Sequence, residues 1–385
     1  MDVPPPACLK SPPNIPHKLL LGPGPSNAAE DVLQAMTSPL LGHLHPEFLK
    51  IMDEVKEGIQ YVFQTKNKLT FAISGTGHAG MECALVNLLE PGDRLLVVDI
   101  GFWANRATDM AERCGATVQR VTEPPGKAVD AATLEKAIES YRPHVVFVVQ
   151  GESSTGVCQP LEKFGSICHK HGALLVVDTV ASLGGAEFYA DRLEVDCVYS
   201  ATQKCLNAPP SLAPISFSER ALEKIKKRTK KVQSYYLDAE LLGNYWGCFD
   251  EPRRYHHTGM ISSVYALRAA LARLAAEGLD EAVQKHKRNV QLLYIGLDDI
   301  GVSPFVQDEK LRLPCLTTVA VPEGIDAKQV CDTLMSQGIE VAGGLGPTVG
   351  KLWRIGTFGM NSNEANIKRV VAAMKAALAD QKHHI

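Results

Sequence analysis

The chain has 385 residues, of which 45% are apolar and 22% charged, as in an ordinary globular protein with a large core. The formal net charge is only -3, which gives no reason to expect nucleic acid as a partner. The basic run Lys224–Lys231 is interpreted as a solvated helix face. No apolar run is long enough to cross a bilayer, and the ten cysteines form no CxxC pair. We therefore expect buried, reduced thiols and neither a metal site nor a membrane partner.

The N-terminal stretch, MDVPPPACLKSPPNIP, is rich in proline. Proline fixes φ and removes a backbone donor, so the composition favours an extended arm over residues 1–16. The early acid and the prolines are not typical of a secretory signal or of an Arg-rich presequence.

Short apolar runs then alternate with helical patterns. The runs are continuous Val, Ile, Leu and Phe stretches, which are typical of strands buried on both faces of a parallel sheet. Strands are predicted at Leu69–Ile73, Leu95–Asp99, Thr117–Val121, Val145–Val149, Leu174–Asp178 and Cys197–Tyr199, and helices at His78–Leu89, Trp103–Cys114, Ala131–Tyr141 and Leu161–His171. Such a βαβ series predicts an α/β domain with a mostly parallel sheet.

A long helical region over residues 262–300 is broken near Gly278, and a second, smaller α/β unit follows. Its predicted elements are strands at Leu316–Val321 and Ile339–Val341 and helices at Ala327–Ser336 and Glu364–Leu378. We therefore divide the chain into an arm at 1–16, a large domain at 17–277 and a small C-terminal domain at 278–385.

A glycine-rich loop follows the first predicted strand. Gly75-Thr-Gly77-His-Ala-Gly80 matches GxGxxG and opens a helix. Asp93 and Asp99 lie roughly where a ribose-binding acid could be, so the loop alone is compatible with a nicotinamide or flavin enzyme. Glycine and the free N–H groups of a helix start accommodate any phosphate, however. The loop predicts a phosphate site without identifying the ligand, and the alternative is a tight turn with no ligand.

Three further features suit one cofactor better than a dinucleotide. Asp178 ends a buried strand, where ligands bind in an open α/β sheet and where a carboxylate can bond a protonated pyridine nitrogen. Lys204 lies just past the next strand, in a polar loop that packing explains poorly. Trp103 follows the strand ending at Asp99 and can present its face to a flat ring. Together with the phosphate loop, these residues suit pyridoxal 5'-phosphate (PLP). Each alone has a simpler reading, as a turn cap, a surface lysine or a core tryptophan.

Longer stretches of the chain resemble fold-type I PLP enzymes of class V, and closely the alanine–glyoxylate (serine–pyruvate) aminotransferases, from about Ile15 to about residue 380. The matching stretches are Leu19–Asn27, Ile51–Gly58, Ser74–His78, Gly151–Gly156, Val177–Gly185, Gln203-Lys204, Tyr255–Thr258 and Gly343–Pro347. The resemblance implies a transaminase with a large PLP-binding domain and a smaller C-terminal domain. It implies amino acids and 2-oxo acids as substrates. The 3-hydroxykynurenine transaminases share much of the pattern and remain an alternative.

The resemblance also implies residue roles. Lys204 would be the Schiff-base lysine and Asp178 the partner of the pyridinium nitrogen. Ring and phosphate contacts would come from Thr76, Gly77, His78, Trp103, Ser153, Val180 and Gln203, with Tyr255 and Thr258 supplied by the neighbouring subunit of a homodimer. Arg354 and Gly24 would bind the substrate.

Two positions depart from the family pattern. Ser211 stands where glycine is usual, and Gly259 where isoleucine or a similar residue is usual. Both put fine substrate preference in doubt more than the cofactor. His383-His384-Ile385 faintly resembles a peroxisomal tripeptide. The expected compartment is therefore the peroxisome, with cytoplasm or mitochondrion as alternatives.

Overall fold

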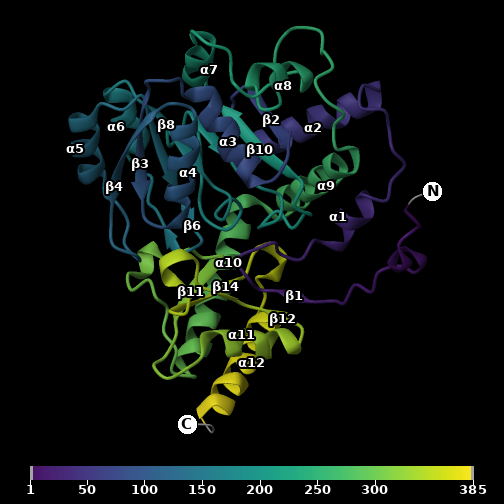
Figure 1. The fold of residues 1–385 in the computed structure, drawn as a ribbon, viewed down its shortest axis with the longest axis vertical. Coiled ribbons are helices and arrows are strands. Elements are labelled where there is room, and N and C mark those ends of the chain that lie inside the picture. The colour runs from purple at the N-terminus through teal and green to yellow at the C-terminus, as the bar shows by residue number, and fades with distance from the viewer. Residues whose placement is uncertain (1–2, 383–385) are drawn as a thin grey trace.

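A computed structural model describes residues 3–382. The chain forms a larger and a smaller α/β unit, with the N-terminal segment running along one side toward the smaller unit (Figure 1). The C-terminal tripeptide that suggested a peroxisomal address lies outside the described residues.

The larger unit is built on a seven-stranded sheet. Its strand order is β2 (Leu69–Ser74), β10 (Leu212–Phe217), β9 (Cys197–Tyr199), β8 (Leu174–Asp178), β5 (Val145–Val149), β3 (Arg94–Asp99) and β4 (Thr117–Thr122). Only β10 is antiparallel to its neighbours, so the expected mostly parallel sheet is confirmed. Every residue of β2, β5, β8 and β10 is buried, because layers of helices cover both faces.

Helices connect and cover these strands. They are α1 (Glu30–Ala35), α2 (Pro46–Phe63), α3 (Gly77–Leu88), α4 (Phe102–Arg113), α5 (Ala131–Tyr141), α6 (Phe164–Lys170), α7 (Glu219–Lys226), α8 (Ala239–Tyr245) and α9 (Ile261–Glu277). Two short strands, β6 (Gly151–Glu152) and β7 (Val157–Cys158), form a hairpin after β5. Both α3 and α4 begin just after a strand of the sheet, so their N-termini lie at its carboxyl edge (Figure 1).

The smaller unit has its own sheet and core. β11 (Leu316–Ala320), β14 (Leu352–Gly356) and β13 (Ala342–Gly343) form an antiparallel sheet, packed with α10 (Leu279–Asp298), α11 (Ala327–Ser336) and α12 (Glu364–Lys382). Its buried core includes Leu297, Trp353 and Met374. α9 ends at Glu277 and α10 begins at Leu279, on either side of Gly278.

The division into an arm at 1–16, a large domain at 17–277 and a small domain at 278–385 remains a prediction. It does not anticipate that a strand of the predicted large domain pairs with one of the smaller unit. β1 (Leu19–Leu20), expected within the large domain, pairs in parallel with β12 (Ile339–Glu340). Leu21 is buried in the core of the smaller unit. A two-strand pairing across more than 300 positions leaves no periodic signal in the sequence, so pattern reading could not find it.

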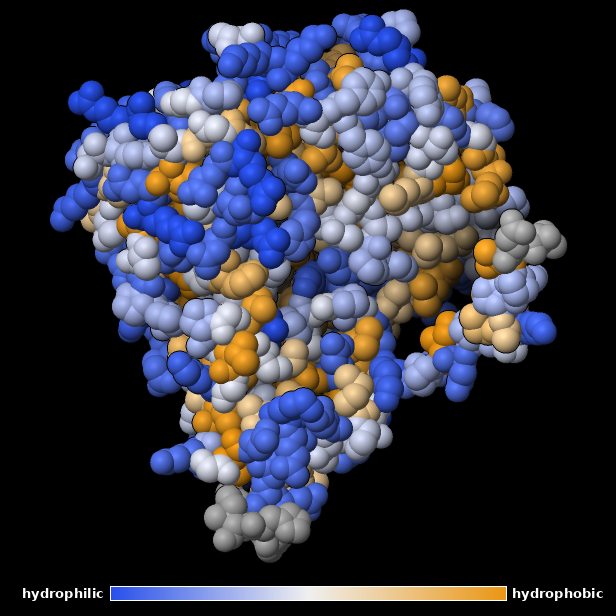
Figure 2. Space-filling model, in the orientation of Figure 1, coloured by the Kyte–Doolittle hydropathy of each residue, from blue (hydrophilic) through white to orange (hydrophobic). Residues whose placement is uncertain are grey.

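The surface, the cysteines and the basic run can be compared with the expectations from composition. The face in Figure 2 is largely hydrophilic, with hydrophobic residues gathered beside the N-terminal segment. No helix among residues 3–382 is long and apolar enough to span a membrane. All ten cysteines are free, and most are buried. The basic run begins in the last turn of α7, where Lys224 pairs with Asp93 at 3.0 Å.

Candidate active site

A pocket of about 240 Å³ lies where the carboxyl ends of the parallel strands meet the smaller unit. Most of the residues expected to form the site line it, namely Gly24, Gly77, His78, Trp103, Ser153, Asp178, Val180, Gln203, Lys204 and Arg354. Thr76, Tyr255 and Thr258 do not line it. The pocket therefore joins residues from the N-terminal segment, from five strand ends of the large sheet and from β14.

Asp178 is the last residue of β8 and is 5% exposed. Its Oδ2 accepts a hydrogen bond from the Tyr199 hydroxyl at 2.5 Å, and its Oδ1 accepts one from the Val180 amide at 2.7 Å. Burial raises the pKa of Asp178 to about 6, although both hydrogen bonds and nearby Lys204 oppose the rise. At neutral pH the side chain is mainly a carboxylate.

Lys204 lies in the turn after β9, and its Nζ donates a hydrogen bond to the carbonyl oxygen of Pro23. Burial, followed by the positive charge of Arg354, lowers the pKa of this amine to about 8. The backbone of Gly24 passes against the same side chain. A Cβ built there would lie 2.8 Å from Cδ of Lys204, and the φ of +108° also favours glycine. Because Lys204 is buried and lies near Arg354, its ammonium group loses the proton more readily than an exposed lysine does.

Trp103 stands at the start of α4 with its indole at the pocket. Its Nε1 donates a hydrogen bond to Oγ of Ser153 at 2.9 Å, and the His78 ring meets the indole edge-on with 5.5 Å between centroids. Across the pocket, a Cβ on Gly77 would lie 3.0 Å from Val180, so glycine permits this close packing. Trp103 and Val180 can thus bracket a flat ring.

The start of α3 offers an anion site. The first amides of a helix have no partner inside the helix, and the Thr76 side chain does not cap them. Gln203 adds a side-chain oxygen that is buried without a hydrogen-bond partner. The amides of Gly77 and His78 therefore remain available to a phosphate.

Arg354 reaches the pocket from β14 in the smaller unit. Its Nε donates a hydrogen bond to the carbonyl oxygen of Gly343 at 2.8 Å, which orients the guanidinium group. Burial lowers the pKa of Arg354 from its usual value, and Glu152 opposes the change. The group stays cationic and can hold a carboxylate with two parallel hydrogen bonds.

Tyr255 and Thr258 lie on an exposed segment before α9, away from Lys204. Tyr255 is 61% exposed and packs its ring edge-on against His43. Between them, the His257 ring is bonded to Oγ of Ser74 at 2.8 Å. Both exposed side chains are thus free to reach a neighbouring molecule.

The comparison with known proteins agrees with this geometry. The family model for "Aminotransferase class-V" matches residues 19–370. The chain belongs to the class-V aminotransferase family. A Drosophila melanogaster protein named alanine–glyoxylate aminotransferase is 47% identical over 99% of this chain and 98% of its own. A Bacillus subtilis (S)-ureidoglycine–glyoxylate transaminase is 35% identical over 94% of this chain and 91% of its own. The crystal structure of an alanine–glyoxylate aminotransferase from Nostoc sp. has a TM-score of 0.93 and 46% identity, covering 96% of this chain and 97% of that one.

Enzymes of this family are PLP-dependent transaminases that act on amino acids and 2-oxo acids. The two acids that a dinucleotide reading needed are engaged elsewhere in this aminotransferase. Asp93 precedes β3, at the end of the strand far from the pocket, and pairs with Lys224; Asp99 pairs with Arg120 at 3.3 Å. Both acids are therefore already paired with basic side chains.

Sequence reasoning missed two buried groups of the aminotransferase site. Tyr199 pairs with Asp178 in the register of β8 and β9, so the strand alignment could have found it. Glu152 follows Gly151 in a matching stretch and was not singled out. The structure also places Ser211 and Gly259, the two residues that depart from the family pattern. The Ser211 carbonyl accepts a hydrogen bond from the Gly75 amide at 2.9 Å, and a Cβ on Gly259 would lie 3.0 Å from the Tyr245 hydroxyl.

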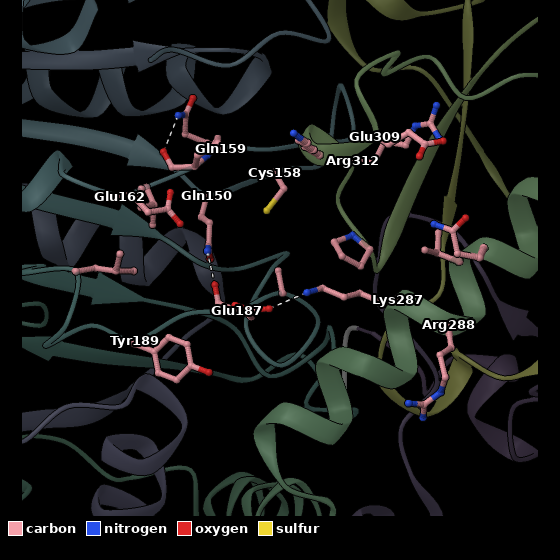
Figure 3. Close-up of a pocket in the computed structure, with 18 of the residues that line it drawn as sticks. Gln150, Cys158, Gln159, Glu162, Glu187, Tyr189, Lys287, Arg288, Glu309 and Arg312 are labelled. Carbon is pink, nitrogen blue, oxygen red and sulfur yellow. Dashed lines mark hydrogen bonds and ion pairs between the residues drawn. The ribbon is translucent and has the colours of Figure 1, made fainter. Parts of the chain in front are cut away.

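A second, larger pocket of about 670 Å³ lies between the large sheet and α10 (Figure 3). Four of its charged residues form two pairs, Lys287 with Glu187 at 2.7 Å and Arg312 with Glu309 at 3.1 Å. The buried Gln150 amide already donates to the Glu187 carbonyl oxygen at 2.8 Å. Because these groups already have partners, the pocket offers no convergent set comparable to that around Lys204.

Proposed function

We propose that this class-V aminotransferase uses PLP to move an amino group from alanine (or serine) to glyoxylate, giving pyruvate (or hydroxypyruvate) and glycine. The convergence of Lys204, Asp178 and Arg354 on one pocket carries the proposal. The printed names of the Drosophila and Nostoc relatives support this substrate pair. They do not favour the 3-hydroxykynurenine alternative.

The residues present fit PLP. Gln203 has an unpartnered buried oxygen and lines the same pocket as Gly77 and His78 at the start of α3. Trp103 and Val180 line the same pocket as Asp178, so both side chains are available to contact a pyridine ring held there. Lys204 lines the same pocket and would supply the amine that bonds the cofactor's aldehyde carbon. The pocket thus has separate places for a phosphate, a ring nitrogen and a carbonyl carbon.

When bound, PLP supplies a ring that accepts the electrons left when the amino acid loses its α-proton. The Asp178 carboxylate favours a protonated ring nitrogen because opposite charges attract. Lys204, with a pKa of about 8, is in part a free amine at neutral pH and can carry the proton from the substrate carbon. Arg354 holds the substrate carboxylate and so fixes the direction of the bond to be broken.

We further propose that the enzyme is a homodimer with shared sites. The family resemblance assigns Tyr255 and Thr258 to the phosphate, yet both lie outside their own chain's pocket. Leu44 and Met260 are exposed apolar side chains near Tyr255, since Leu44 follows His43, whose ring packs against Tyr255, and Met260 is five residues further along the chain. A second copy that covered this surface could deliver Tyr255 and Thr258 to its neighbour's phosphate site.

A panel of amino donors tests the function. Alanine, serine and 3-hydroxykynurenine would each be offered with glyoxylate and with pyruvate, and Lys204→Ala would serve as the inactive control. We expect the highest kcat/KM for alanine with glyoxylate, parallel double-reciprocal lines, and a visible absorbance band that alanine shifts. Intersecting lines, or a colourless protein that PLP does not change, would refute the assignment.

The peroxisomal location stays a proposal that rests mainly on the family resemblance and only weakly on the tripeptide 383–385. A fluorescent protein carrying the last residues of this chain should enter peroxisomes, and deletion of residues 383–385 should abolish its import. Uniform cytoplasmic or mitochondrial fluorescence would refute the proposal.

A further inference from the structure

We propose that Glu152 is a positioning residue that fixes the start of α4 and thereby holds the Trp103 indole at the cofactor pocket. Only the identity of the group on which the indole stacks rests on the proposed function. The contacts that carry the inference belong to this chain alone.

Three consecutive residues of the β6–β7 turn each accept one N–H from the first two residues of α4. Oε2 of Glu152 accepts from the Trp103 amide at 3.3 Å. Oγ of Ser153 accepts from Nε1 of Trp103 at 2.9 Å, and Oγ of Ser154 accepts from the Phe102 amide at 2.9 Å. The turn therefore bonds both the backbone and the side chain of the residue that faces the ring.

Glu152 connects these contacts. Its Oε1 accepts from the amide of Ser154 at 2.8 Å and from the Ser154 hydroxyl at 2.6 Å. That second bond leaves Oγ of Ser154 free to accept the Phe102 amide. The carboxylate thus holds one helix amide directly and orients the acceptor of the other. It satisfies donors that a helix N-terminus leaves without intrahelical partners, and its charge is favourable there.

The packing around Glu152 leaves it little freedom. The side chain has no exposed surface. A Cβ built on Gly101, the residue before α4, would lie 2.5 Å from Cδ of Glu152 and 2.7 Å from Oγ of Ser154. Glycine at 101 is thus what allows the turn to approach the helix. Burial raises the pKa of Glu152 to about 7, against the effect of the bonds from Ser154 and Trp103.

If Glu152 only stabilised the start of α4, its replacement would not change the surroundings of the Trp103 indole. The experiment therefore monitors the indole directly. The protein has three tryptophans, Trp103, Trp246 and Trp353, and the last two are buried. With 5-fluorotryptophan incorporated, fluorine NMR of the apoenzyme gives a signal for each, and Trp103→Phe identifies the one of interest. The readout needs neither cofactor nor activity.

Glu152→Gln keeps the shape of the side chain but places an amide donor against a backbone donor. We expect the Trp103 signal to shift and broaden while those of Trp246 and Trp353 stay in place, and PLP to bind about tenfold more weakly. Glu162→Gln, in the exposed loop that follows β7, is the matched control and should leave both measurements unchanged. An unchanged Trp103 signal in folded Glu152→Gln would overturn the proposal.

Gly101→Ala provides a second, independent disturbance. Its Cβ should displace the carboxylate and reproduce the Trp103 signal of Glu152→Gln. Because both changes disrupt the same contact, the double variant should differ little from either single one. Additive effects on the signal would also overturn the proposal. If the wild-type protein shows no transamination, the proposed function is refuted, but the fluorine NMR test of Glu152 remains valid.

Discussion

The Tyr199 hydroxyl donates a 2.5 Å hydrogen bond to Oδ2 of Asp178, from the strand next to the one that Asp178 ends. Both side chains are buried, so neither has water as an alternative partner. The bond favours the ionised form of Asp178 in a place where burial disfavours it. Tyr199 therefore helps to keep this carboxylate charged at the pocket.

Tyr199→Phe should raise the pKa of Asp178, because it removes a donor to the carboxylate while the burial remains. The acidic limb of the kcat/KM profile should move to higher pH. The free energy of unfolding should fall by about 1–3 kcal/mol, as one buried partner is lost. The matched control is Tyr189→Phe, which removes a hydrogen bond of 3.0 Å to Asp280 in an exposed position and should change stability by no more than about 0.5 kcal/mol. An unmoved acidic limb would contradict the role given to Tyr199.

The apoenzyme should lose stability as the pH rises through the titration of Asp178. Its folded pKa lies above the ordinary value of 3.8, at about 6, so the unfolded chain releases the proton first. Stability from this group is fully present below its ordinary pKa and is lost as the pH reaches about 6. Asp178→Asn should remove this component from chemical-unfolding curves measured between these pH values. The exposed Asp109→Asn should retain it, and equal slopes in the two variants would contradict the prediction.

Arg354→Lys should weaken the grip on the substrate carboxylate, because an ammonium group cannot form two parallel hydrogen bonds with it. We expect kcat/KM for alanine to fall by about 10- to 100-fold, with PLP binding unchanged. Amines that lack a carboxylate should react as they do with the wild type. Arg369→Lys, on the exposed side of α12, is the control for a general charge effect. A similar loss for both kinds of amine would indicate that Arg354 acts on the fold instead.

Mixed dimers should recover activity that neither parent has. One chain would carry Lys204→Ala and the other Tyr255→Phe with Thr258→Val. In a hybrid, one of the two sites combines an intact lysine with an intact phosphate segment. Random exchange should therefore restore about a quarter of the wild-type sites if the dimer is symmetric. No recovery after verified exchange would show that Tyr255 and Thr258 do not act across subunits.

The buried parallel strands could be predicted because unbroken apolar runs occur mainly where both faces of a sheet are covered. β10 was not predicted. β10 contains Pro214, and proline argues against a central strand. The strand β10 nevertheless pairs with both β2 and β9. β14 was not predicted as a strand either, since its five residues end at a glycine and contain Arg354.

Lys204, Asp178 and Trp103 could be assigned to one site because each follows a strand, and the carboxyl ends of parallel strands share an edge. The residues that contact Asp178 and Trp103 could not be assigned to the site in the same way. Tyr199 can be found only once the strands β8 and β9 are aligned in register, and Glu152 contacts α4 through a turn that leaves no periodic signal in the sequence. Thr76 was expected beside the phosphate, but its exposed side chain does not line the pocket.

The short pairing of β1 with β12 has a consequence for substrate binding. The Leu21 carbonyl oxygen accepts a hydrogen bond from Gly356, two residues after Arg354, while Pro23 contacts the amine of Lys204. A rotation of the smaller unit would therefore carry the guanidinium group and the backbone beside the amine together. Closure over a substrate would then tighten the carboxylate grip and change the surroundings of the proton-carrying amine in a single movement.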